Sequence, residues 1–346
     1  IYMADLNVAA YEVLEQRRIE DIASDGYILR HKKSGARVCV ISNDDDNKVF
    51  SIGFRTPPED ETGVPHIIEH TTLCGSDKFP VKDPFVELVK GSLNTFLNAM
   101  TYPDKTLYPV ASYNEQDFKN LMDVYLDAVF HPNITKYQEI FMQEGWHYEL
   151  ESEDAPLMIN GVVYNEMKGA YSSPDEVLQT AIAQTLFPDN TYSKNSGGDP
   201  DHIPELTYEH YLDFYHKYYH PSNSYIYLYG DMDVKERLEW MDRAYLSAYE
   251  SMEIDSNIPM QNPFDEMKFV ETTFPITDDD PEENNTYLSY NMVIADVLDP
   301  TLYQAFTVLD YVLVSAPGAP VRQALIDAGI GQDVYGSYEN EMLQPF

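Results

Sequence analysis

The residues best suited to do chemistry lie in one short stretch, His66-Ile67-Ile68-Glu69-His70. On a helix, His66 and His70 are at positions i and i+4 and share a face, so both imidazoles can reach one Zn²⁺ ion at about 2.0–2.1 Å. Glu69 lies near the same face without being a ligand. That position suits a general base acting on metal-bound water, and the pattern H-x-x-E-H is a known zinc motif.

A catalytic zinc needs a third protein ligand and one open position for water. We take Glu166 as the candidate, because it sits on a second predicted helix behind an apolar run that should bury the helix base. Composition alone does not select it from 59 carboxylates. Cys74 is a rival, since it lies at i+4 from His70 and could extend the ligand face. Its place near the predicted helix end is more typical of a small buried thiol.

The elements that must position these residues follow from periodicity and turn signals. A helix is predicted from about 65 to 73, with Pro65 at its first position and Gly75 just past its end. Strands at 37–41 and 49–54 flank a turn-rich segment and predict a hairpin, and a second hairpin is expected from strands at 94–101 and 106–112. Apolar residues at i, i+3, i+4 and i+7 predict an amphipathic helix over 114–130. Further helices are expected at about 136–148, 161–172, 174–187, 207–219 and 233–250, and a strand at 225–230.

This order of elements predicts an α+β fold, with an antiparallel-rich sheet covered by helices. We expect residues 1–252 to form a zinc-binding catalytic domain. Residues 253–285 are rich in proline and acidic side chains and are interpreted as a linker. A strand at 287–294 and a helix at 301–315 would begin a second, related α+β domain over 286–346, which the chain leaves incomplete.

The charge balance excludes several classes of function. There are 22 Lys and Arg against 59 Asp and Glu, a formal net charge of −37, which disfavours binding to nucleic acid or to an anionic membrane. With only two cysteines, no disulfide framework is expected. No apolar run approaches the roughly 18 residues of a membrane helix, and the first residues lack signal-peptide features. We expect a soluble protein, cytoplasmic if bacterial, or in an organelle matrix if a targeting segment was removed.

Several separated blocks carry a resemblance to a known family. They are GVPHIIEH at 63–70, LCGS at 73–76, LNTFLNA at 93–99, TLYP at 106–109, VYNEMKG at 163–169, SGGDP at 196–200 and HPSN at 220–223. In this order they resemble the pitrilysin/insulinase family of inverzincin zinc metallopeptidases, and within it the presequence-protease (falcilysin-like) branch. The resemblance runs from about residue 10 to residue 346 and implies a pitrilysin-like metallohydrolase fold.

The resemblance also implies roles for individual residues. His66, His70 and Glu166 would bind one Zn²⁺ per chain, and Glu69 would take a proton from the zinc-bound water and pass it to the leaving amine. Asn98 and Ala99 match the edge strand on which family members pair an extended substrate by β-augmentation. One departure stands out: shorter-spaced relatives carry a second glutamate seven residues before the zinc glutamate, and this sequence has Ile159 there.

The implied function is a zinc-dependent endopeptidase that hydrolyses unfolded peptides, such as presequence-like peptides, inside a chamber closed by two halves of one polypeptide. Such a protein would be a monomer at full length. This chain lacks the C-terminal half, so we expect it to bind zinc with little or no peptidase activity. An acidic chamber wall would favour cationic peptides. Two alternatives stay open: a non-catalytic scaffold relative, and a peptide-binding module whose structural zinc is completed by Cys74.

Overall fold

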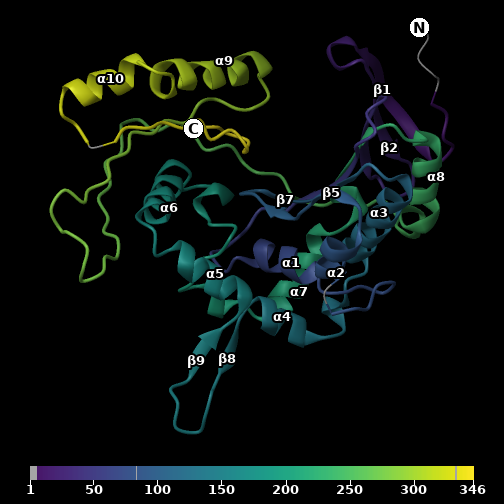
Figure 1. Cartoon of the computed structure of the whole chain (residues 1–346), viewed down its shortest axis with the longest axis horizontal. Coiled ribbons are helices and arrows are strands. Elements are labelled where there is room, and N and C mark those ends of the chain that lie inside the picture. Colours follow the sequence, from purple (N-terminus) through teal and green to yellow (C-terminus); the bar gives the residue numbers. More distant parts are fainter. Residues whose placement is uncertain (1–5, 83, 332) are drawn as a thin grey trace. The chain divides into compact units, whose positions relative to one another are not determined.

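The computed structural model describes residues 6–82, 84–331 and 333–346 (Figure 1). The chain divides into two compact units. Unit 1 comprises Ile1–Ser172 and Lys194–Asn257, and unit 2 comprises Ser173–Ser193 and Ile258–Phe346. The domain boundaries expected from the sequence, at 252 and 285, stay a prediction, and the two units are described separately below.

One sheet forms the centre of unit 1. Its strands in the described residues are β1 (Tyr11–Ile19), β2 (Ser24–His31), β3 (Arg37–Ser42), β4 (Lys48–Arg55), β5 (Asn94–Leu97), β6 (Met100–Thr101), β7 (Lys105–Ser112) and β10 (Ser224–Gly230). Their order is β1-β2-β3-β10-β4-β7-β5, and β6 also pairs with β7. Every pair is antiparallel except β3 with β10. The expected antiparallel-rich sheet is confirmed.

The hairpin predicted between the strands at 37–41 and 49–54 is wrong, although both strands form. β10 lies between them, so Tyr227 pairs with Cys39 on one side and with Ser51 on the other. The turn-rich segment between β3 and β4 instead caps β10, where the Asp231 amide donates to the carbonyl of Asp45. The apolar side chains of β10 are buried in the core, and this burial selects the pairing over the local turn. The second hairpin is confirmed, because β5 and β6 both pair with β7.

Helices cover one face of this sheet (Figure 1). Those of unit 1 are α1 (Val64–Thr72), α2 (Pro84–Gly91), α3 (Glu115–Phe130), α4 (Gln138–Glu144), α5 (Val162–Ala170), α7 (Tyr208–Tyr218) and α8 (Val234–Ala244). Side chains of α1, α3, α7 and α8 share one hydrophobic core with the sheet. Phe118, Leu121 and Tyr125 of α3 are fully buried, as its periodicity predicts. On the uncovered face of the sheet, Tyr225 and Tyr227 of β10 stay exposed.

The helix expected at 136–148 ends earlier than predicted. α4 ends at Glu144, and a two-stranded hairpin of β8 (His147–Glu149) and β9 (Met158–Asn160) follows. This hairpin projects from the unit (Figure 1). Gly145 follows the helix at a position without room for a side chain, since a Cβ there would meet the carbonyl oxygen of Phe141 at 2.8 Å and the side chain of Ile67 at 3.2 Å.

Unit 2 contains α6 (Pro174–Leu186), α9 (Pro300–Asp310), which continues into one π-helical turn (Tyr311–Ser315), and α10 (Pro320–Asp327). The predicted helix at 301–315 is confirmed. The strand predicted at 287–294 is wrong: the segment is irregular, and its backbone bonds the chain end only at Ile294, whose amide donates to Pro345. No long partner strand is present within unit 2 as described. No helix among the described residues is long and apolar enough to cross a bilayer.

Candidate metal centre

The helix that carries the H-x-x-E-H pattern, α1, is buried and held in place by hydrogen bonds to tyrosines of neighbouring elements. Ile67 and Ile68 of α1 are fully buried. Thr71 donates to the carbonyl of Ile67 and accepts a hydrogen bond from the hydroxyl of Tyr211 at 2.6 Å. Thr72 donates to the hydroxyl of Tyr108 at 3.2 Å. Because these buried hydroxyls all have partners, they fix the position of α1 rather than weaken it.

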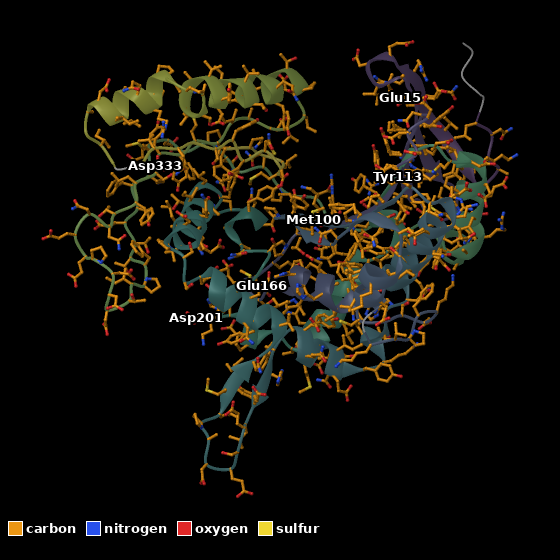
Figure 2. The ribbon with its side chains drawn as sticks, viewed as in Figure 1. Glu15, Met100, Tyr113, Glu166, Asp201 and Asp333 are labelled. Carbon is orange, nitrogen blue, oxygen red and sulfur yellow. The ribbon has the colours of Figure 1, made fainter. Side chains whose placement is uncertain are left out.

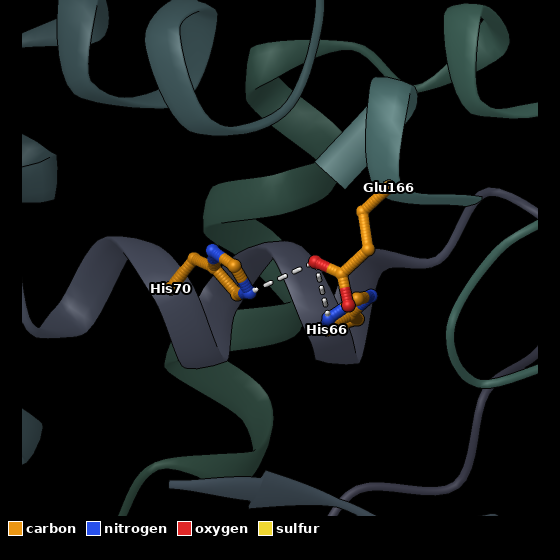
Figure 3. A group of neighbouring side chains, drawn as sticks. All are labelled: His66, His70 and Glu166. Atoms are coloured by element: carbon orange, nitrogen blue, oxygen red, sulfur yellow. Dashed lines mark ion pairs between the residues drawn. The ribbon is translucent and has the colours of Figure 1, made fainter. Parts of the chain in front are cut away.

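Two histidines on this helix meet one glutamate from another. Nε2 of His66 lies 3.8 Å from Oε2 of Glu166, and Nε2 of His70 lies 3.7 Å from the same oxygen (Figure 3). The three potential ligand atoms all lie within 4.8 Å of one another. A tetrahedral Zn²⁺ with bonds of about 2.0–2.1 Å spaces its ligand atoms by about 3.3–3.4 Å, so the donor set fits with a small contraction.

The group of potential metal ligands found among the described residues holds only these three. Cys74, the rival candidate, is not part of it, and its thiol donates instead to the carbonyl of His70 at 3.4 Å. A set of two imidazoles and one carboxylate leaves a fourth position open, which is the arrangement of catalytic rather than structural zinc sites.

The other ring nitrogen of each histidine is held by the protein. Nδ1 of His66 donates to the carbonyl of Gly197 at 3.1 Å, because a carbonyl oxygen only accepts. Nδ1 of His70 faces Oε2 of Glu144 at 3.4 Å. Both contacts place the proton on Nδ1 and leave Nε2 of each ring available to bind a metal, which is the usual way that outer contacts orient zinc histidines.

Glu144 is a site residue that the sequence reasoning missed. It is buried, and Gln143 donates to its second oxygen at 2.8 Å. Burial raises its pKa, but hydrogen bonds from His70 and Gln143 outweigh burial and hold the pKa below its usual value. For His70, burial lowers the pKa, and the hydrogen bond to Glu144 with the charges of Glu69 and Glu166 raises it above the ordinary value.

A helical spacing could have revealed Glu144. It lies at i+3 from the buried Phe141, so it shares the face of α4 that packs on α1. Ile159, at the position where shorter-spaced relatives carry a glutamate, lies instead in β9 and pairs with Tyr148. The carboxylate beside His70 therefore comes from a different element of the chain.

Glycines let the element that carries Glu166 approach α1 closely. A Cβ on Gly161, the residue before α5, would lie 2.1 Å from the carbonyl oxygen of Gly145. Val163 and Met167 anchor α5 in the core, while the side chain of Glu166 is 53% exposed and reaches over α1. The close backbone approach at the two glycines thus helps to bring Glu166 within reach of the histidines.

A second glycine contact joins the loop at 194–199 to the start of α1. Gly63 has φ +67°, and a Cβ there would lie 2.6 Å from the carbonyl oxygen of Gly197 and 2.7 Å from Cα of Gly198. Glu61 ties down both ends of this loop, since its carboxylate accepts from the Asn195 amide and its carbonyl from the Asp199 amide, each at 2.8 Å. The loop therefore presents the Gly197 carbonyl to His66.

A pocket of about 440 Å³ opens beside His66 and Glu166. It is lined by His66, Glu69, Ala99, Met100, Thr101, Tyr102, Glu166 and Gly197. Met100 of β6 and Glu166 of α5, both labelled in Figure 2, thus border the same space. Glu69 is 9% exposed, and it lines the pocket together with His66 of the same helix.

The two residues predicted to bind substrate lie between β5 and β6. Ala99 lines the pocket. Asn98 is not on the pocket wall; its amide donates to Pro109, and its carbonyl accepts from the hydroxyl of Tyr125 at 3.2 Å. Their role in substrate binding stays a prediction.

Comparison with known proteins places this geometry in a family. The model of the insulinase family (peptidase family M16) matches residues 49–196, and that of the peptidase M16 inactive domain matches residues 205–344. Protein HypA of Clostridium perfringens is 55% identical over 97% of this chain, and presequence protease 1, chloroplastic/mitochondrial, of Arabidopsis thaliana is 45% identical over 97%. The chain covers 34% and 31% of these two proteins, about a third of their length.

Solved structures show the same fold. The crystal structure of pitrilysin matches 73% of this chain and 26% of its own chain, with a TM-score of 0.57 at 20% identity. A protease from Helicobacter pylori matches 93% of this chain and 73% of its own, with a TM-score of 0.65 at 14% identity. The fold is pitrilysin-like, and this chain belongs to the insulinase (M16) family of peptidases.

Proposed function

We propose that this chain provides the catalytic domain of a zinc-dependent endopeptidase that hydrolyses unfolded peptides. The observation that carries this proposal is the convergence of His66, His70 and Glu166 within 4.8 Å, with Glu69 on the wall of the same pocket. Zn²⁺, when bound, supplies a Lewis acid that polarises the scissile carbonyl and brings the pKa of a bound water toward about 7.

The residues of this chain bind the metal, transfer the proton and align the peptide. His66, His70 and Glu166 hold the metal. Glu69 takes a proton from the attacking water as the new C–O bond forms, and delivers it to the amine nitrogen as the C–N bond breaks. Asn98 and Ala99 align the peptide as an added strand beside β6, which pairs with β7 on its other side.

The substrates we propose are presequence-like peptides in extended form. Arabidopsis and animal relatives are named presequence proteases. Targeting presequences are rich in arginine and poor in acidic residues. A chain of net charge −37 attracts such cations. Further polypeptide, to the length of the relatives, would close a chamber around the peptide in a monomer; without it we expect this chain to bind one Zn²⁺ and hydrolyse little.

The variant Glu69→Gln tests the function. In a polypeptide of the relatives' full length it should retain one zinc per chain, measured by elemental analysis, and lose hydrolysis of a quenched fluorescent presequence peptide by at least about 10²–10⁴-fold. Glu139→Gln, on an exposed part of α4, is the matched control. Hydrolysis unchanged in Glu69→Gln would remove Glu69 as the base. A zinc-loaded but inactive unmutated protein would favour a non-catalytic relative.

A further inference from the structure

A threonine hydroxyl contacts the proposed base. Thr101 of β6 donates from Oγ1 to Oε2 of Glu69 at 2.5 Å, and both residues line the pocket. No other hydrogen bond to the Glu69 carboxylate is found among the described residues, so its Oε1 is left without a donor. An ionised carboxylate only accepts hydrogen bonds, which gives the hydroxyl of Thr101 the donor role.

Thr101 is held in place by the sheet. It pairs with Thr106 of β7, and the amide of Tyr102 donates to the carbonyl of Lys105 at 2.8 Å, closing the turn between β6 and β7. Thr106 is fully buried and hydrogen-bonded to Thr56 at 2.8 Å. A β-branched side chain on a paired strand has few rotamers, so the hydroxyl of Thr101 points in a fixed direction.

We propose that Thr101 is a positioning residue for catalysis. Its hydroxyl holds one oxygen of the Glu69 carboxylate, and the other oxygen thereby faces the attacking water. This inference rests on the proposed function. A glutamate side chain without such a contact samples several rotamers, and only a fraction of them place an oxygen within the 2.6–3.2 Å that proton transfer needs.

The same short strand borders the predicted substrate position. Ala99 and Met100 line the pocket directly before Thr101. A peptide that pairs along this strand would therefore lie against the residue that orients the base. The segment around β6 would then align both the scissile bond and the Glu69 carboxylate. Loss of the Thr101 hydroxyl should therefore slow the chemical step and leave peptide binding nearly unchanged.

The test compares three variants in a polypeptide of the relatives' full length, with a quenched fluorescent presequence peptide. Thr101→Val keeps the shape and removes the hydroxyl, and kcat should fall about 10- to 100-fold, the size expected for a hydrogen bond to a charged group. KM should change less than about twofold, since a transition-state interaction is lost. Thr101→Ser keeps the hydroxyl and should recover most of kcat. Thr95→Val, on β5 away from the pocket wall, is the matched control.

A second readout needs no turnover. The Zn²⁺ dissociation constant of this chain, measured by competition with a chromogenic chelator, should be the same for Thr101→Val and the unmutated chain, because the hydroxyl of Thr101 bonds Glu69 and not a proposed metal ligand. An unchanged kcat in Thr101→Val, equal kcat for the Val and Ser variants, or a loss that appears only in KM would each overturn the inference. Glu69→Gln is measured alongside: if it keeps hydrolysis, the proposed function fails, whereas an inactive Glu69→Gln with a normal Thr101→Val rejects Thr101 alone.

Discussion

The two units of the chain differ in how much interior they have. In unit 1 the sheet shares one core with α1, α3, α4, α5, α7 and α8, and the threonine hydroxyls of α1 and their tyrosine partners are buried and hydrogen-bonded. In unit 2 the buried cluster consists of Phe187, Tyr192 and Met342, and none of the residues of α9 or α10 is buried. Exposed apolar residues on α9 and the π-helical turn include Val308, Leu309, Tyr311 and Val312.

The difference shows what a pre-formed group of potential metal ligands requires. His66 and His70 keep their orientation because neighbouring elements hold their Nδ1 atoms, and those elements are themselves packed. Unit 2 carries many carboxylates, but those of the run Asp278–Glu283 are exposed, and no potential ligand group is found in unit 2 among the described residues. Acidic side chains become a site only where a core fixes them.

Core truncation should give the largest contrast between the units. Phe118→Ala removes a fully buried ring from α3 and should lower the free energy of unfolding of unit 1 by about 3–5 kcal/mol. Leu309→Ala, at a side chain 41% exposed in α9, should change unit 2 by no more than about 0.5 kcal/mol. Both tryptophans, Trp146 and Trp240, lie in unit 1, so urea titrations read by fluorescence report unit 1, and circular dichroism adds the helices of unit 2. Equal losses would contradict the contrast.

Zinc should stabilise one unit only. At about 1,000 times its dissociation constant, Zn²⁺ should add about 4 kcal/mol to the unfolding free energy read by tryptophan fluorescence. The unfolding transition of unit 2, which is detected only by circular dichroism, should keep its midpoint when Zn²⁺ is added. His66→Ala removes a ligand and should abolish the shift. A zinc effect on both steps would mean that the units unfold together.

Backbone crowding at Gly63 should be the next largest effect. Gly63→Ala adds a Cβ 2.6 Å from the Gly197 carbonyl at positive φ, and should destabilise unit 1 by about 2–3 kcal/mol. It should also weaken zinc binding, since the Gly197 carbonyl orients His66. Gly318 of unit 2 has φ +75° with open space around it, so Gly318→Ala isolates the cost of φ alone, about 1 kcal/mol. Similar costs at both positions would show that the close contact is not needed.

Removing one carboxylate charge should weaken zinc binding when the residue is Glu144 of unit 1, and should not when it is Glu282 of unit 2. Glu144→Gln removes the carboxylate charge and leaves one side-chain oxygen for two donors, Nδ1 of His70 and the Gln143 side chain, so it should weaken zinc binding about 10- to 100-fold. Glu282→Gln, in the exposed acidic run, should leave the zinc affinity unchanged. The two variants remove the same charge, so chelator competition at low and high salt separates local orientation from the net field. Equal weakening would assign the effect to net charge.

The smallest predicted effect depends on pH. Asp127 is buried at the end of α3; burial raises its pKa, but the hydrogen bond with His131 and the Lys78 amide lower it below the usual value. A carboxylate whose pKa is lower in the folded state stabilises the fold at pH values above its ordinary pKa of about 4. This stabilisation is lost as the pH falls through the pKa of the folded state. Asp127→Asn should therefore cost about 1–2 kcal/mol at pH 7 and less as the pH drops below about 4. A constant cost across that range would exclude the ionised form as its source.

The local part of the site was predictable from sequence, and the long-range part was not. The helix bearing His66, Glu69 and His70 follows from a five-residue pattern with a proline before it and a glycine after it. Glu166 needed the family resemblance, because its approach to α1 depends on the contact between Gly145 and Gly161. Such contacts between distant residues have no signature in the spacing of either segment.

The errors in the fold have the same origin. The turn-rich segment before β4 is typical of a hairpin, yet β10 occupies that place because its buried residues complete the core. The segment 287–294 has strand-forming residues but no partner in the described part of unit 2. Strand propensity reflects how well a segment fits a pleated, half-buried surface. A sequence can therefore show that a segment is able to form a strand, but a pairing partner is needed for the strand to form.

The position of β10 has a consequence for the timing of folding during synthesis. Ser224 pairs with Phe54, about 170 residues earlier. At translation rates of about 5–20 residues per second, roughly 10 to 35 seconds pass between the synthesis of β4 and the synthesis of β10, which pairs with both β3 and β4. During that interval their facing edges are unpaired, and the Gly197 loop and Tyr211 are not yet in place around α1. We therefore expect the nascent chain to be prone to aggregation during this interval, and to bind zinc tightly only after β10 has emerged.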